Sequence, residues 1–149
     1  MLYESDDIMT YQLMENIMTP NLEYTSKLLQ TFENAKTPFI TFSDFKVPLD
    51  DEFHFHYLNL IENSLITDIN LSNINMGICS TDCGVSFTEG IDIRISQRGH
   101  DFVNALTNKN ILNQLKNDFK GAPFKSLFDI SQKLAEHYLK NKLDDILKA

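Results

Sequence analysis

Apolar residues along the chain recur mainly at helical spacing, on one side of each predicted helix. Two segments depart from this pattern and predict strands. Residues 65–69 are expected to begin the first strand, and residues 91–95, which alternate strictly between apolar and polar residues, are expected to form the second. Between them, 70–90 carries glycines among scattered Ser, Thr and Asn, which predicts a long loop. The apolar stripes predict helices over 6–18, 20–34, 50–63, 96–107, 109–120 and 124–147.

Local signals place some of the element boundaries. Thr19 and Pro20 are typical of a helix N-cap and a first helical position, and Ser96 can cap a later helix. Pro38 and the alternation over 39–42 predict a short edge strand or an extended connection.

The order of these elements predicts the fold. Helix, extended segment, helix, strand, long loop, strand and helix is the order of a winged helix, with the strand pair and its loop as the wing. We therefore expect an α+β fold, a winged helix-turn-helix with a long wing loop and additional N- and C-terminal helices. A helical extension over 1–18 would precede the winged-helix domain over 19–107. Helices over 108–149 would pack on this domain or form a dimer interface.

The length of 149 residues and the composition suit one globular domain, or one domain with an appendage. There is no apolar run long enough to span a membrane, and the first residues lack the basic and apolar regions of a secretory signal. Two cysteines in such a chain are expected to be free thiols in a reducing compartment. We therefore expect a cytoplasmic protein without a membrane partner.

The charge is divided unevenly. Residues 1–78 hold three lysines against twelve acids, a net charge of −9, whereas 79–149 has a net charge of +1. Proteins that bind duplex DNA gain affinity by placing Lys and Arg on phosphates, so the first half would repel DNA and attract a basic surface.

Two stretches resemble known proteins. Residues 56–66 resemble the second helix and following turn of winged-helix proteins, although 63–64 is Asn-Ser in place of a small residue and glycine. Residues 95–106 look like the signature of an uncharacterised family of small phage and prophage proteins, in which a wing strand runs into Gly-His-acid-Phe, here 99–102. The similarity extends from about Asn21 to the C-terminus. It implies a winged helix in the cytoplasm of a bacterial host, and no particular activity.

The helix over 50–63 is the candidate partner-binding element, because its polar residues include acids and no Lys or Arg. Reading of base edges ordinarily uses Arg, Lys, Asn or Gln, with basic residues on the phosphates. We expect a non-enzymatic, phage- or prophage-type protein that binds a basic protein surface, such as an anti-CRISPR-like inhibitor of a bacterial defence or of a nucleic-acid-handling enzyme. A plain solvated acidic surface is an equal alternative. The candidate residues are Asp50, Asp51, Glu52, His54, Asn59 and Glu62.

Two other functions stay open. A DNA-binding transcriptional regulator would use the wing and a basic flank at Arg94 and Arg98, although Asp92 and Asp101 favour a mixed solvated surface there. A structural component of a phage particle is the third hypothesis. A homodimer that forms through the N-terminal helix or through the long last helix would also fit the sequence.

Catalytic and metal motifs are weak. Cys79 and Cys83 have a spacing that zinc sites permit, but the sequence holds no second ligand pair, so we expect no metal or cofactor. Residues 84–88 fall one glycine short of a nucleophile elbow, and we expect no enzymatic activity. For His100 we expect a bond to a nearby backbone carbonyl at the helix start, with Gly99 allowing close approach.

Overall fold

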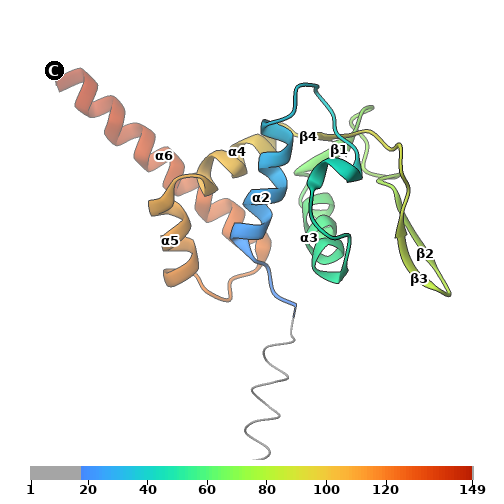
Figure 1. Cartoon of the computed structure of the whole chain (residues 1–149). Coiled ribbons are helices and arrows are strands. Elements are labelled where there is room, and N and C mark those ends of the chain that lie inside the picture. Colours follow the sequence, from blue (N-terminus) through green and yellow to red (C-terminus); the bar gives the residue numbers. More distant parts are fainter. Residues whose placement is uncertain (1–17, 149) are drawn as a thin grey trace, which may run out of the picture.

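The computed structural model describes residues 18–148 and has a mixed α+β architecture (Figure 1). The predicted helix over 6–18 lies outside the described residues except for Met18, which is not helical. The helices are α2 (Leu22–Glu33), α3 (Asp51–Glu62), α4 (Gln97–Leu106), α5 (Lys109–Asp118) and α6 (Phe124–Lys148), with a short 3₁₀ helix η1 (Phe42–Phe45). The strands are β1 (Ile66–Asp68), β2 (Ile78–Thr81), β3 (Gly84–Phe87) and β4 (Ile93–Ile95).

Side-chain caps fix where α2, α3, α4 and α5 begin. The Asn21 side chain accepts a hydrogen bond of 3.0 Å from the Tyr24 N–H, so α2 starts at Leu22 and the predicted N-cap at Thr19 is wrong. Asn21 replaces Thr19 because its amide oxygen is the acceptor that reaches the first free N–H groups. The predicted cap at Ser96 is confirmed, since its hydroxyl accepts from the Gly99 N–H at 3.1 Å.

The strands form two separate antiparallel pairs. In the first, β1 pairs with β4, with Ile66 opposite Ile95. Ile40 forms a single bridge to Ile93 on the other side of β4, through two backbone bonds of 2.8 Å. The extended segment expected over 39–42 is therefore reduced to this bridge, because Phe42 already begins η1.

The second pair, the β2–β3 hairpin, corrects the prediction of a loop over 70–90. Ile78 pairs with Phe87 and Thr81 pairs with Gly84, which leaves two residues in the turn. Gly84 adopts a φ of +115°, a value that side-chain-bearing residues rarely accept. Only the end of the hairpin nearest the body is partly buried, so these strands lack the continuous buried apolar face by which a strand is recognised from a sequence.

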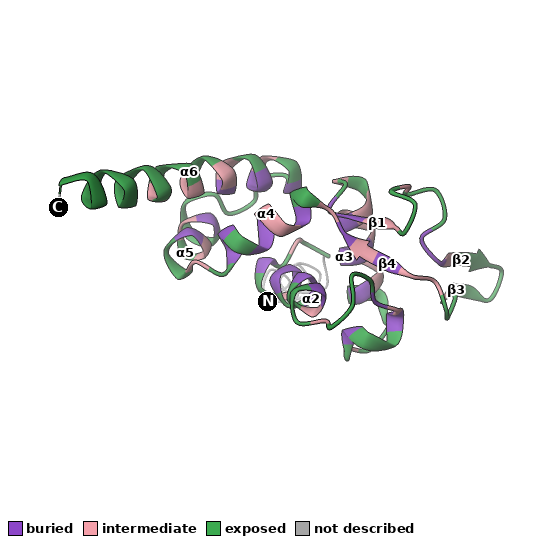
Figure 2. Cartoon of the chain, turned by 90° about the horizontal axis from the view of Figure 1, so that it is seen from above, coloured by how far each residue is buried: buried purple, intermediate pink, exposed green. Residues whose placement is uncertain are grey.

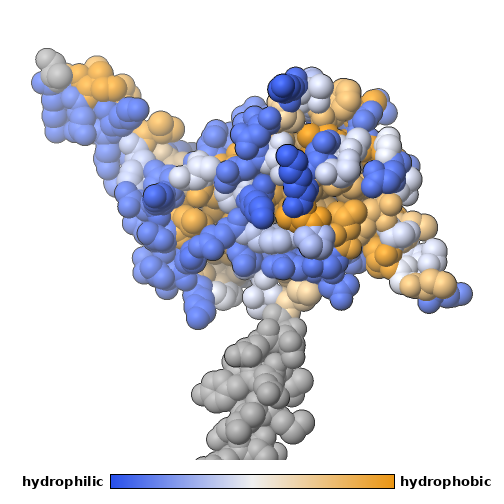
Figure 3. All heavy atoms as spheres, in the orientation of Figure 1, coloured by the Kyte–Doolittle hydropathy of each residue, from blue (hydrophilic) through white to orange (hydrophobic). Residues whose placement is uncertain are grey.

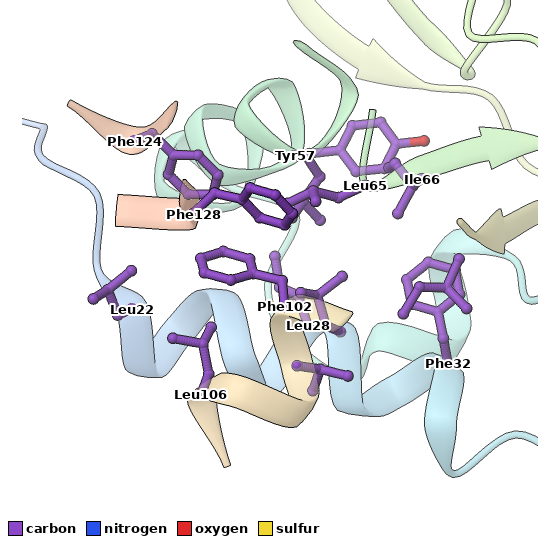
Figure 4. Close-up of a cluster of buried hydrophobic side chains, with 14 of the residues drawn as sticks. Leu22, Leu28, Phe32, Tyr57, Leu65, Ile66, Phe102, Leu106, Phe124 and Phe128 are labelled. Carbon is purple, nitrogen blue, oxygen red and sulfur yellow. The ribbon is translucent and has the colours of Figure 1, made fainter. Parts of the chain in front are cut away.

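A single hydrophobic core joins most of the elements. Figure 4 shows Phe102 of α4 beside two rings from the start of α6, and its ring centroid lies 5.5 Å from that of Phe124 and 5.4 Å from that of Phe128. Figure 2 shows burial along α2, α4 and the first turns of α6, whereas the far end of α6 is exposed throughout. Among the described residues, no helix has the length and apolarity that crossing a bilayer would need.

The connection between α3, the strands and α4 is tight at two positions. Ser64, in the turn after α3, takes a φ of 58° that is usually left to glycine. At Gly99 an added Cβ would lie 2.3 Å from the carbonyl oxygen of Leu65, so the close approach expected there is confirmed. These contacts set the position of α3 relative to β1 and α4.

Candidate functional site

The candidate site is the side of α3 that faces away from the core. Phe53, His56, Tyr57 and Leu60 form the buried side of this helix. The opposite positions recur at helical spacing: Asp51 and Glu62 are exposed, and Phe55 and Leu58 between them are partly buried. We call these four residues, Asp51, Phe55, Leu58 and Glu62, the outward face of α3.

The structure places the predicted acids at two ends of one helix. Asp50, Asp51 and Glu52 lie at its N-terminus, and the Asp50 carboxylate is the N-cap, accepting from the Phe53 N–H at 3.0 Å. Glu62 is ten residues further along than Glu52, which separates the two by about 15 Å on an α-helix. The acids therefore share a helix but do not form a single cluster.

The other two predicted residues of α3 have different surroundings. The His54 ring centroid lies 6.0 Å from that of Phe87, so this side chain is directed toward the hairpin. The Nδ2 of Asn59 is buried and has no hydrogen-bond partner among the described residues. Asn59 is therefore not presented to solvent as a base-reading amide would be.

Tyr24 of α2 lies beside the acidic N-terminal end of α3, and this proximity was not predicted from the sequence. Burial raises the pKa of Tyr24 to about 12, with further contributions from the negative charges of Asp50 and Glu52. Its phenol is thus neutral and lies near both carboxylates. We call Tyr24, Asp50, Asp51 and Glu52 the acidic corner.

His56 holds the acidic corner in place. Its ring is buried and lies 4.5 Å from the Tyr24 ring, centroid to centroid. Nδ1 is 2.7 Å from the Glu52 carbonyl oxygen and must donate to it, while Nε2 accepts from the Asn21 N–H at 2.9 Å. This pattern requires a neutral imidazole, and burial lowers the pKa of His56 accordingly. His56 is therefore a structural link between α2 and α3.

The hairpin projects from the body next to α3 (Figure 1). Its base is anchored by Phe87, whose ring centroid lies 5.1 Å from Phe42 and 5.2 Å from Phe53. The Tyr57 hydroxyl donates to the Met76 carbonyl at 2.8 Å just before the hairpin. Beyond this base the strands are exposed to solvent.

The two cysteines lie on the exposed part of the hairpin. Cys79 is on β2 and Cys83 is in the turn, and both are free thiols. Within residues 18–148, no three His, Cys, Asp or Glu side chains are grouped as a metal site would need.

The two arginines of the expected basic flank are on different elements. Arg98 of α4 donates from Nε to the Asn63 carbonyl at 3.2 Å, and its Cζ lies 4.1 Å from the centroid of the Phe128 ring. Arg94 is on β4 opposite Thr67 and is partly buried. Arg98 thus connects the end of α3 to α6 and serves the packing of the fold.

His100 differs from the expectation. Its Nδ1 lies 2.7 Å from a carboxylate oxygen of Glu33, so it joins α4 to α2 through a side chain and not through a backbone carbonyl. His100 contacts this carboxylate and not a backbone carbonyl because α2 and α4 pack against each other and bring Glu33 within reach.

Two open hollows lie elsewhere on the molecule. One of about 720 Å³ lies between the start of α2 and the end of α5, and one of about 440 Å³ lies between α2 and η1. Neither is lined by an α3 residue, so these two hollows lie apart from the outward face of α3. No family model, no curated protein and no solved structure matches the chain.

Proposed function

We propose that this protein acts by binding another protein through the acidic corner and the outward face of α3. The observation that carries the proposal is the composition of that face, where two half-buried apolar side chains, Phe55 and Leu58, lie between the exposed carboxylates of Asp51 and Glu62. Apolar anchors within a polar rim are typical of protein interfaces. A phosphate backbone would meet negative charge and no cation along this helix.

A winged-helix topology is part of the proposal. It is supported by the order of elements and by the position of β4 between β1 and the bridge at Ile40. In this interpretation the β2–β3 hairpin is the tip of the wing, and α3 is the helix that would enter a DNA groove in a DNA-binding relative. The fold alone decides no function, so the chemistry of α3 carries the argument.

The partner that fits this surface is a protein with a basic groove. A host or defence-system protein that handles nucleic acid has such a groove, and carboxylates of the acidic corner would occupy its phosphate positions. The charge of −9 over 1–78 and the resemblance of 95–106 to phage and prophage proteins support an inhibitor of this kind. This anti-defence role is non-enzymatic.

The experiment is capture from a bacterial lysate followed by reconstitution with the purified partner. The variant Asp51→Lys/Glu52→Lys reverses two exposed charges and leaves the cap at Asp50 intact, so binding should fall by a factor of about ten or more. Asp118→Lys/Asp129→Lys is the matched control, since both residues are exposed acids outside α3. Binding that both double variants weaken equally contradicts a site on α3.

Duplex DNA binding separates the proposal from the regulator hypothesis. We expect no retention of duplex DNA at any salt concentration, measured by fluorescence anisotropy. Binding that weakens steeply with salt and is lost in Arg94→Ala would overturn the proposal and favour a DNA-binding regulator.

A further inference from the structure

The far end of α6 carries four exposed apolar side chains on one side. Leu139, Leu143, Ile146 and Leu147 are 67%, 54%, 62% and 73% exposed, at the spacing i, i+4, i+7 and i+8. We call these residues the tail stripe. Figure 3 shows hydrophobic surface along this end of α6, beyond the body of the molecule.

The tail stripe does not continue the side of α6 that faces the body. The first turns bury Leu127, Phe128 and Ser131, whereas positions 139–147 are rotated about the helix axis by roughly 100° from the centre of that side. Packing on the body therefore cannot cover the stripe. A contiguous apolar stripe on an otherwise unsupported helix is typical of an interaction surface.

The charges beside the tail stripe indicate what covers it. Lys140 and Lys142 precede Leu143, and Asp144 and Asp145 follow it. If a second copy of the helix runs antiparallel about Leu143, Lys140 and Asp144, which lie on the same flank of the stripe, come beside Asp144 and Lys140 of the second copy. In a parallel pair this flank would face the opposite flank of the second copy, so these two pairs of opposite charges would not form.

We propose that two copies of this chain associate through their tail stripes, antiparallel about Leu143. Leu143 then packs on Leu143 of the second copy, and Leu139 packs on its Leu147. Four side chains form a smaller seam than the interface of about 800 Å² per partner that is usual for stable complexes. The dimer is therefore in equilibrium with the monomer, and this inference does not depend on the proposed function of α3.

Analytical ultracentrifugation of the full chain tests the association. The average mass should rise with concentration from 17.2 kDa toward twice that value. Leu143→Asp should raise the dissociation constant about tenfold or more, because it places a charge at the centre of the seam. Ile74→Asp is the matched control, since Ile74 is 92% exposed but lies on the loop before β2. Circular dichroism should show unchanged folding in both variants.

Cysteine cross-linking tests the orientation, in a background where Cys79 and Cys83 are changed to serine. Leu143→Cys should form a disulfide-linked dimer. Leu139→Cys alone should not, since the two copies of position 139 would lie about 12 Å apart along the axis, too far for a disulfide. A mixture of Leu139→Cys and Leu147→Cys chains should cross-link.

Four results would overturn the proposal. They are a chain that stays monomeric, a dimer that Leu143→Asp does not weaken, cross-linking of Leu139→Cys to itself, and loss of the dimer when residues 1–17 alone are removed. The last result would assign the interface to the N-terminal segment.

Discussion

The imidazole of His56 accepts a hydrogen bond of 2.9 Å from the backbone N–H of Asn21. Asn21 caps α2 and His56 is buried on α3, so this bond joins the two helices through residues that are 35 positions apart in the chain. The bond exists only while the imidazole is neutral, which makes the packing of α2 on α3 sensitive to pH.

The stability of the protein should therefore fall in mild acid. Burial lowers the pKa of folded His56 below 6.5, so between 6.5 and that lower value the unfolded chain binds a proton that the folded chain does not. The contribution of His56 is fully present above pH 6.5 and is lost progressively below it. Urea unfolding at a series of pH values measures this loss. His56→Gln should flatten the pH dependence, whereas His137→Gln, at an exposed position, should leave it unchanged.

Truncation of Phe87 should loosen the hairpin. The ring packs on Phe42 and Phe53 at the base, so Phe87→Ala should lower the free energy of unfolding by about 2 kcal/mol. Amide hydrogen exchange over β2 and β3 should become faster at the same time. Val85→Ala, on the exposed part of β3, should change stability by less than about 0.5 kcal/mol. Equal losses from the two variants would contradict the anchoring role of Phe87.

A methyl group at position 99 should be poorly tolerated. The added Cβ would meet the Leu65 carbonyl oxygen at 2.3 Å and Cγ1 of Ile95 at 2.5 Å. Because the first of these is backbone, Gly99→Ala should cost about 3 kcal/mol, measured by thermal or chemical unfolding. Asn104→Ala on the exposed side of α4 is the control and should be neutral or slightly stabilising. A stable Gly99→Ala protein would show that α4 can move away from β1.

Replacement of Arg98 should reveal a role in packing. Its guanidinium lies over the Phe128 ring, so Arg98→Ala should lower the free energy of unfolding by about 1 kcal/mol. Arg98→Lys should recover only part of this, because an ammonium group lacks the planar stacking. The corresponding control is Lys125→Ala, which removes an exposed cation of α6. An Arg98→Ala variant as stable as the original chain would contradict the packing role of Arg98, and its side chain would then be available to bind a ligand.

The helices could be predicted from the sequence because each buries an apolar stripe, as the bounds of α3 and α6 illustrate. The hairpin could not, because β2 and β3 present almost no buried side to the core. At the candidate site, the carboxylates of α3 were predicted, but Tyr24 was missed because its proximity to Asp50 arises from tertiary packing. Phe55 and Leu58 could have been found by placing α3 on a helical wheel, opposite Phe53 and Leu60.

The length of α6 has a consequence for how partners would be engaged. Its 25 residues span about 37 Å, and the tail stripe lies at the end furthest from the body. Two copies joined there carry two separate α3 surfaces on one particle. A symmetric target would contact both α3 surfaces of one dimer. Its release would require both contacts to open at the same time, which slows dissociation far beyond that of either contact alone.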